Sequence, residues 1–497
     1  MKCLFLTPLL MLSITASAQP ALVKNIMPNV FSSNPSRLTV FNYRLYFFAD
    51  DGFKGYELWA HDGVNTDMAK DIYQGPTDCA PNSPAHRMAV LDNKLYFPAD
   101  NGTNGLELYS NDGGSNTVLV SDIATGLNSS EIDEIIAANG KLYFDATNGT
   151  NGKELWQYTP AINTAEQLSF INTGPGSDPA WITEANGRIY FTALDPAKGR
   201  ELFEYNPATT QVIMVADIYP GITSSDPSSL VNVSGALYFT ASSPDYGREL
   251  YKYDGSGLQR LTDLNAGPGD GLAAHSDGLP VIGVVGDELY IAGNDGTAGF
   301  QLFRYNYINN QSAHVATINS GGNSTPAGFI RYANKLFFTA DDGTHGRELW
   351  MKHGNNPPAM VADINTNSAV NIQPMGMVEY KGGLYFSAYG ADGNELYKYS
   401  DAAAGVVSFN QGIDVKVFPN PTVTEVYFSL DIQQRDELSI RLTDATGRQV
   451  YKTRHEEYLP GVNLTSIPVD WLPAGQYYYQ VNNGSGQTFA AGRLVKL

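Results

Sequence analysis

The apolar residues of this chain fall into short paired runs separated by turn residues, and the clearest pair is LFFTADDGTHGRELW at 336–350. The branched and aromatic run 336–338 suits a pleated strand, 341–346 supplies turn residues, and 349–350 begins a second apolar run. This pattern predicts a β-hairpin. Neither run alternates apolar with polar residues, which is typical of a sheet that is covered on both faces.

The hairpin recurs along the chain with a period of 47 to 52 residues, so that eight copies can be aligned. The first run reads LYF or a close variant at 45–47, 95–97, 142–144, 189–191, 237–239, 289–291, 336–338 and 384–386. The second run reads ELW or a close variant that begins at Glu57, Glu107, Glu154, Glu201, Glu249, Gln301, Glu348 and Glu395. A shorter apolar stretch precedes each hairpin, as at 230–233, and another follows it, as at 212–218, which predicts four strands per unit.

Such a unit is too small to bury its own apolar side chains, so the units must cover each other's faces. Four-stranded units of this length are typical of a β-propeller. An open stack would need polar capping units, whereas the first and last copies are as apolar as the middle ones. We therefore predict an all-β chain with an eight-bladed β-propeller, whose ring is closed by a strand at 22–26 or at 404–409.

The two ends of the chain differ from the repeats. Residues 1–18 combine Lys2, an apolar stretch and a small-residue end at Ala16 and Ala18, which predicts a secretory signal peptide. Beyond it Cys79 is the one remaining cysteine, so no internal disulfide is expected and a buried or loop cysteine is the simplest interpretation. The repeats occupy 19–411, and short strands between turn residues at 412–497 predict a small C-terminal β-sandwich.

The C-terminal segment resembles the sorting domain of type IX secretion substrates. The resemblance rests on VFPNP at 417–421, DATGRQV at 444–450, LPAGQYYYQV at 472–481 and GRLVKL at 492–497. It implies export across the inner membrane by the signal peptide, passage through the outer membrane by the type IX machinery, removal of this domain, and release or attachment to surface lipopolysaccharide. The residues implied as the sorting signal are Pro419, Asn420, Pro421, Gly475, Tyr477, Leu494, Val495 and Lys496. The repeats also resemble the ELW-and-DGT repeats of other exported bacterial proteins.

The net charge of −20 argues against nucleic acid as a partner, because both molecules would be acidic. A cationic ligand or calcium would fit better. The turns between the hairpin strands carry Asp50, Asp51, Asp100, Asp341 and Asp342. These carboxylates are candidate calcium ligands, but their spacing matches no full calcium loop, and closing turns through backbone N–H groups explains them without a ligand.

The glutamates of the ELW runs recur once per unit, whereas a catalytic carboxylate is needed once or in a pair. We therefore expect them to be structural, holding the next strand or turn by hydrogen bonds. We also expect the turns to share one acidic face with the aspartates that end the fourth strands, namely Asp71, Asp122, Asp217, Asp263 and Asp363.

Departures from the repeat are where a binding site is most expected, because recognition of one ligand needs asymmetry. The two longest departures carry Asp270, His275 and Asp277, and Asp78 and His86. These five residues are the candidate ligand-binding residues, although each segment can be a plain insertion. The histidines lack metal-ligand spacing, and no nucleophile-elbow, zinc-protease or phosphate-loop motif is present.

The sequence thus favours a secreted or cell-surface propeller without catalytic activity that binds a glycan or a protein. The alternatives are a propeller enzyme, glycosidase or lyase, that acts on extracellular polysaccharide, and a purely structural surface protein. The enzyme would need two acids, or a histidine with a tyrosine, close together at one end of the channel.

Overall fold

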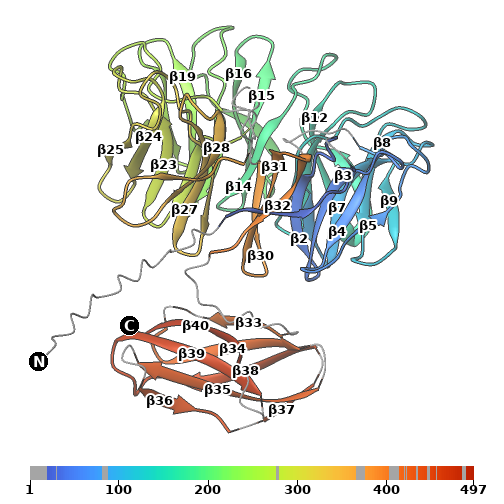
Figure 1. The fold of residues 1–497 in the computed structure, drawn as a ribbon. Coiled ribbons are helices and arrows are strands. Elements are labelled where there is room, and N and C mark those ends of the chain that lie inside the picture. The colour runs from blue at the N-terminus through green and yellow to red at the C-terminus, as the bar shows by residue number, and fades with distance from the viewer. Residues whose placement is uncertain are drawn as a thin grey trace, which may run out of the picture. The chain divides into compact units, whose positions relative to one another are not determined.

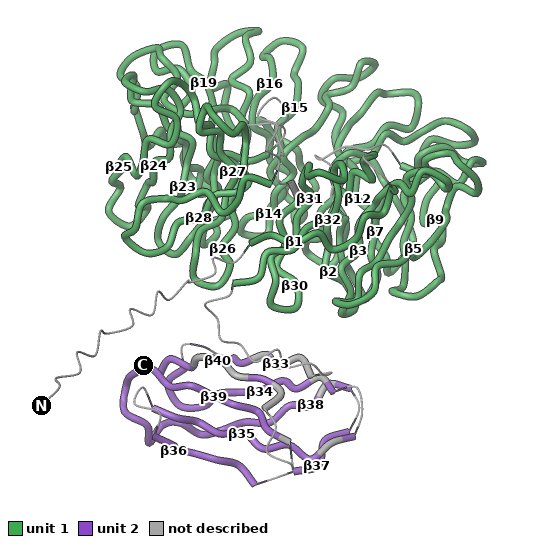
Figure 2. Tube along the Cα trace, viewed as in Figure 1, with its two compact units in different colours: residues 1–402 green, residues 403–497 purple. Residues whose placement is uncertain are grey.

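The computed structural model describes residues 19–28, 31–80, 88–275, 279–364, 375–401 and 413–496, the last range with short gaps at 419, 421, 433–434, 445–447, 455, 460 and 484–487. The chain divides into two compact units, residues 1–402 and 403–497 (Figure 2). The predicted signal peptide at 1–18 and the alternative closing strand at 404–409 lie outside the described residues. Apart from the short 3₁₀ helix Pro160–Ile162, the described residues contain no helix, and therefore none that could cross a membrane.

Unit 1 is built from antiparallel four-stranded sheets, and eight of them lie within the described residues. In chain order, the first sheet has β2 Ser36–Phe41, β3 Arg44–Asp50, β4 Tyr56–His61 and β5 Thr66–Lys70, and the second has β6 Ala89–Leu91, β7 Lys94–Asp100, β8 Leu106–Asn111 and β9 Thr117–Ser121. The third sheet has β10 Ile135–Ala138, β11 Lys141–Ala146, β12 Glu154–Thr159 and β13 Thr164–Gln167, and the fourth has β14 Ala180–Ala185, β15 Arg188–Asp195, β16 Gly199–Asn206 and β17 Gln211–Ala216.

The fifth to seventh sheets follow the same order. The fifth has β18 Ser228–Val233, β19 Ala236–Ser243, β20 Gly247–Tyr253 and β21 Leu258–Arg260, and the sixth has β22 Ile282–Val285, β23 Glu288–Gly293, β24 Gln301–Asn306 and β25 Gln311–Ala316. The seventh has β26 Ala327–Tyr332, β27 Lys335–Asp341, β28 Arg347–Lys352 and β29 Ala359–Ala362. The eighth sheet has β30 Met375–Tyr380, β31 Gly383–Gly390 and β32 Gly393–Tyr399, and its fourth strand is the N-terminal β1, Ala21–Lys24.

The sheets follow one another in space and return to their start. First strands of neighbouring sheets contact each other, as β14 does β18 and β22 does β26, and β30 of the eighth sheet contacts β2 of the first. In Figure 1 the blue first sheet lies next to the orange eighth one. Because β1 pairs with β32, the N-terminal strand, of the two alternatives, is the one that completes the eighth sheet.

The apolar cores of unit 1 lie between neighbouring sheets. Phe48 of the first sheet packs with Phe97 of the second, and Tyr143 of the third packs with Phe191 of the fourth. A further core joins Phe47 of the first sheet to Tyr385 of the eighth. Both faces of these sheets are therefore covered, which explains why their strands do not alternate apolar with polar residues.

The tight turns inside the sheets follow the predicted chemistry. Asn139 and Gly140 join β10 to β11 with φ of 53° and 72°, and Asn186 and Gly187 join β14 to β15 with φ of 50° and 78°. Both positions of such a turn need positive φ, which asparagine and glycine tolerate best.

Unit 2 contains a three-stranded and a five-stranded antiparallel sheet. The first has β33 Ile413–Phe418, β34 Glu425–Ile432 and β38 Gly461–Pro468, and the second has β35 Asp436–Asp444, β36 Gln449–Lys452, β37 Glu456–Tyr458, β39 Gly475–Asn483 and β40 Thr488–Lys496. One buried cluster joins Phe428 and Ile467 of the first sheet to Ile440 and Val481 of the second. Unit 2 thus has a hydrophobic core of its own.

Candidate functional site

The recurrent glutamates of unit 1 are structural. All seven have an exposed fraction of 0%, and each carboxylate accepts hydrogen bonds from the segment that follows the fourth strand of its sheet. Glu57, for example, accepts from Ile72 N at 2.6 Å and Tyr73 N at 3.1 Å. The structure thus shows the hydrogen bonds that the repetition predicted.

Glu395 makes the corresponding contacts to the N-terminus of the chain. It accepts from Ile26 N at 3.1 Å, from Ser33 N at 3.2 Å and from the Ser33 hydroxyl at 2.5 Å. Gln301 occupies the position of the glutamate in the sixth sheet. Its side-chain oxygen accepts from Ile318 N, and its Nε2 donates to three carbonyl oxygens. Burial raises the pKa of Glu57, Glu107 and Glu249 to about 7, since the backbone donors offset the loss of water only in part.

The turn aspartates close their own turns. Asp50 Oδ1 accepts from Gly52 N at 2.7 Å, and Asp51 Oδ1 accepts from Phe53 N and Lys54 N. Asp100, Asp341 and Asp342 make the same kind of bond to residues two or three positions later. Within the described ranges, no group of three or more His, Cys, Asp or Glu side chains is arranged to hold a metal ion.

These turns lie beside the ends of the fourth strands, as predicted. Lys54 pairs with Asp71 at 2.7 Å, Lys198 with Asp217 at 2.8 Å, and Asn104 donates to Asp122 at 3.1 Å. We call this end of unit 1, formed by the second-to-third-strand turns and the connections between sheets, the loop face. Its aspartates are partly neutralised, because lysines from the turns pair with two of them.

Within the described residues, the aspartates of the two longest departures from the repeat accept hydrogen bonds from the backbone of their own sheets. Asp78 accepts from Tyr56 N and Asp270 from Arg248 N, both at 2.8 Å, and Ser129 and Ser224 accept from Leu106 N and Arg200 N in the same way. Asp78 and Asp270 therefore occupy an ordinary repeat position. His275 is exposed, while Asp277 and His86 lie outside the described residues.

Cys79 is buried and follows the repeat as well. Its thiol hydrogen-bonds the Glu57 carboxylate, where Ser177 and Ser225 donate hydroxyls to Glu154 and Glu201. Burial raises the pKa of the thiol well above its usual value. Cys79 thus occupies the position at which Ser177 and Ser225 donate a hydrogen bond to their glutamates.

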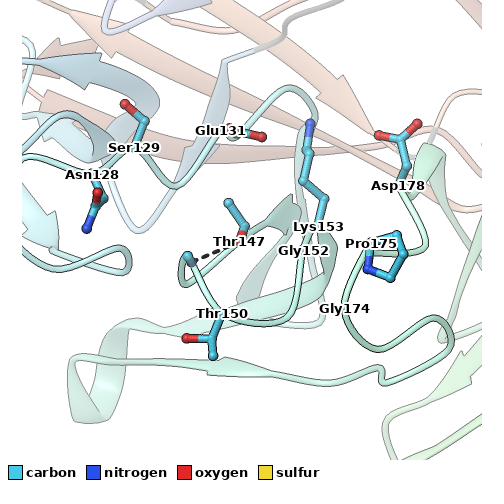
Figure 3. A pocket seen from close by; sticks show the side chains of 11 residues that line it. Asn128, Ser129, Glu131, Thr147, Thr150, Gly152, Lys153, Gly174, Pro175 and Asp178 are labelled. Carbon is cyan, nitrogen blue, oxygen red and sulfur yellow. Dashed lines mark hydrogen bonds between the residues drawn. The ribbon is translucent and has the colours of Figure 1, made fainter.

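A pocket of about 550 Å³ opens on the loop face beside the third sheet, β10–β13. Its walls come from the connection before this sheet, from the β11–β12 turn and from the connection after it (Figure 3). The lining residues are Asn128, Ser129, Glu131, Thr147, Gly149, Thr150, Gly152, Lys153, Gly174, Pro175 and Asp178. This lining is polar and contains no aromatic side chain.

Lys153 connects the pocket to an ionic cluster that contains the buried Asp145 and the half-exposed Asp133. Its Nζ lies 2.5 Å from Asp145 Oδ2 and also pairs with Asp133. Asp145 has an exposed fraction of 0%, and burial raises its pKa to about 7 in spite of the lysine; the two carboxylates raise the pKa of Lys153. Asp145 Oδ1 accepts from the backbone N–H groups of Asp133 and Glu134.

Sequence reasoning missed this cluster, although a signal was present. The residue after the LYF run is Asp145 in the third sheet, whereas it is Thr192, Thr240 and Thr339 in the fourth, fifth and seventh sheets. Comparing the copies position by position would have marked a carboxylate where the other copies carry neutral residues.

In unit 2 the described residues of the predicted sorting signal meet where β39 begins and β40 ends. Gly475 pairs with Lys496 and the buried Tyr477 with the buried Leu494 across the two strands. Asn420 Oδ1 accepts from Val495 N at 2.8 Å, 75 residues away in the chain. Pro419 and Pro421 lie outside the described residues.

Residues 416–494 match the family model described as "Secretion system C-terminal sorting domain". This match agrees with the resemblance seen in the sequence and covers most of unit 2. The protein is therefore secreted to the cell surface or the extracellular space, and the type IX machinery is the partner that exports it. No curated protein matches the chain.

Several solved structures are similar at low identity. PorZ, a surface component of the type IX secretion system of Porphyromonas gingivalis, has 15% identity and a TM-score of 0.31, with 93% of this chain and 75% of PorZ covered. The β-propeller domain of the Trilobed protease from Pyrococcus furiosus has 10% identity and a TM-score of 0.38, covering 67% and 98%. Saccharomyces cerevisiae Sqt1 has 12% identity and a TM-score of 0.42, covering 77% and 98%.

Proposed function

We propose that the chain is an exported eight-bladed β-propeller that binds a glycan or protein ligand through its loop face and does not cleave it. In this proposal each four-stranded sheet is one blade, and residues 1–18 are a signal peptide. Residues 412–497 form a β-sandwich that is removed after export, leaving the propeller released or attached to surface lipopolysaccharide.

The observation that carries the proposal is that the recurrent carboxylates are buried and hydrogen-bonded within unit 1. An enzyme acting on polysaccharide would need acids that face a cleft. The seven buried glutamates instead accept hydrogen bonds from backbone N–H groups and hydroxyls, and Asp145 is held by Lys153. Of the two described acids that line the pocket, Asp178 is paired with Arg200, which leaves Glu131 without the second acid that hydrolysis would need. The polar pocket beside the third sheet is then a binding feature on a rigid support.

The binding role is tested by passing residues 19–497 over immobilised polysaccharides, glycans and peptides, with and without added calcium. Retention without release of shorter products supports the proposal. Release of shorter sugar products would overturn it in favour of a glycosidase or lyase, and no retention on any surface would leave a purely structural role.

The export role is tested by deleting residues 413–497 in the native host. We expect the shortened protein to accumulate in the periplasm, because the signal peptide still directs it across the inner membrane. Appearance of the shortened protein outside the cell at the level of the full chain would contradict this part of the proposal.

A further inference from the structure

Three sheets of unit 1 place an arginine at the position before the recurrent glutamate. Each guanidinium donates to the connection that precedes its own sheet: Arg200 to Asp178 O and Asp178 Oδ2, Arg248 to Asp226 O, and Arg347 to Thr325 O. The acceptor residues are structurally equivalent, since Asp178, Asp226 and Thr325 all have positive φ, between 39° and 49°.

The third sheet carries Lys153 at this position, and Glu131, with φ of 53°, is the counterpart of Asp178. Lys153 is held by Asp133 and Asp145, and none of its contacts reaches Glu131. Glu131 is exposed, and among the described residues its carboxylate has no ion pair or hydrogen bond. Because Lys153 binds Asp133 and Asp145 instead, the contact that the three arginines make with the residue equivalent to Glu131 is missing in the third sheet.

The pocket of about 550 Å³ lies at this place, and Glu131, Lys153 and Asp178 all line it. Figure 3 shows these side chains around the opening, together with Asn128 from the connection before the sheet and Thr150 from the β11–β12 turn. The ionisable groups here are four carboxylates, of Glu131, Asp133, Asp145 and Asp178, and two cations, Lys153 and Arg200. At a pH where all are ionised the local charge is −2, and the whole chain carries −20.

We propose that this pocket receives the guanidinium group of an arginine side chain from a protein partner, which contacts Glu131 as Arg200, Arg248 and Arg347 contact the equivalent residues of their own sheets. The planar fork of a guanidinium matches a carboxylate such as Glu131 through two parallel hydrogen bonds. The absence of an aromatic platform in the lining favours a protein over a glycan at this site. The inference rests on the proposed binding function and names its ligand chemistry.

The test uses two dye-labelled peptides, Gly-Arg-Gly and the same peptide with neutral, isosteric citrulline in place of arginine. Fluorescence polarisation is measured with residues 19–497 as the binding protein. We expect binding of the arginine peptide, weakening as salt is raised, and at least tenfold weaker binding of the citrulline peptide.

Two variants locate the site. Glu131→Gln removes the negative charge without changing the shape of the side chain, and it is expected to weaken binding of the arginine peptide about tenfold. The triple variant D133A/D145T/K153R recreates the set Ala180, Thr192 and Arg200 of the fourth sheet, so the chain's own arginine should fill the pocket and binding should be lost. Asp226→Asn, at a connection already occupied by Arg248, is the matched control and should change affinity less than twofold.

Equal binding of both peptides, or full binding by Glu131→Gln, would overturn the inference. If the triple variant fails to fold, as judged by circular dichroism, Glu131→Gln alone decides. No binding of the arginine peptide alongside retention on a polysaccharide surface would refute this inference and leave the binding function standing. Failure of every surface and both peptides would refute both.

Discussion

The third sheet, β10–β13, and the fifth sheet, β18–β21, use three equivalent positions in opposite ways. In the fifth sheet the set is Ser228, Thr240 and Arg248, and the guanidinium donates to neutral hydroxyl and carbonyl oxygens. In the third sheet the set is Asp133, Asp145 and Lys153, and the cation is held by carboxylates. The same backbone arrangement thus has a connection filled by an arginine in the fifth sheet and an open pocket in the third, and the two sheets differ in these three side chains.

The largest effect is expected from removing the cation in each sheet. Lys153→Met leaves the buried Asp145 without its counter-charge, and we expect a loss of about 3–5 kcal/mol in the free energy of unfolding at pH 8. Arg248→Met leaves only neutral acceptors unsatisfied, for a loss of about 1–3 kcal/mol. Denaturant unfolding followed by tryptophan fluorescence reports mainly on unit 1, which holds four of the five tryptophans.

The loss for Lys153→Met should be smaller at pH 5 than at pH 8. Burial raises the pKa of Asp145 in the folded state, so this carboxyl takes up a proton at low pH and the unpaired charge disappears. The double variant D145T/K153M is the control and should regain most of the lost stability. Equal losses for Lys153→Met and Arg248→Met, or no difference between the two pH values, would contradict the comparison.

The sequence predicted the features that recur and missed the one that occurs once. The hairpin pattern, repeated with a constant period, predicted the four-strand units, and the repetition of Glu57 and its counterparts predicted their structural role. The N-terminal closing strand was one of two alternatives, because residues 22–26 and 404–409 both contain the apolar residues of a short strand and pairing with β32 is a long-range contact.

The site could not be found by looking for long insertions. Asp78 and Asp270 lie in long connections, yet both accept a backbone N–H in the manner of Ser129. The pocket depends on where Lys153 directs its charge, which is set by Asp145 on a neighbouring strand. Such a contact depends on the length and charge of single polar side chains, which a pattern of apolar residues does not describe.

An intermediate effect is expected from the recurrent glutamate of the fifth sheet. The pKa of Glu249 is raised to about 7 by burial, so its contribution to the free energy of unfolding is greatest at low pH and falls as the pH rises from about 4.5 to about 7. Glu249→Gln should make this fall shallower, by on the order of 1–3 kcal/mol over that interval. Gln301 shows that an amide can serve this position in the sixth sheet.

Unfolding free energies measured from pH 4.5 to 8 check this prediction. Gln301→Glu is the matched control, because it adds a buried carboxyl where the chain has an amide, and it should steepen the fall instead. A pH profile for Glu249→Gln that runs parallel to that of the unchanged chain would show that the Glu249 carboxyl does not gain protons on folding.

The smallest effect concerns a position in the connection after a sheet, from which a side chain can donate a hydrogen bond to the recurrent glutamate. After the third sheet it is Ser177, whose hydroxyl lies 2.7 Å from Glu154 Oε2, and after the fifth it is Gly271, which has no side-chain donor. Cys79 is the residue at this position after the first sheet, and its thiol hydrogen-bonds the Glu57 carboxylate.

Since a thiol is a weak donor, Cys79→Ser should leave the free energy of unfolding within about 1 kcal/mol or raise it slightly, whereas Cys79→Ala should lower it by about 1 kcal/mol. Both are measured at pH 8, where Glu57 is ionised and a donor counts most. A Cys79→Ser variant less stable than Cys79→Ala would mean that the apolar volume of the sulfur, and not its hydrogen bond, is what the first sheet uses.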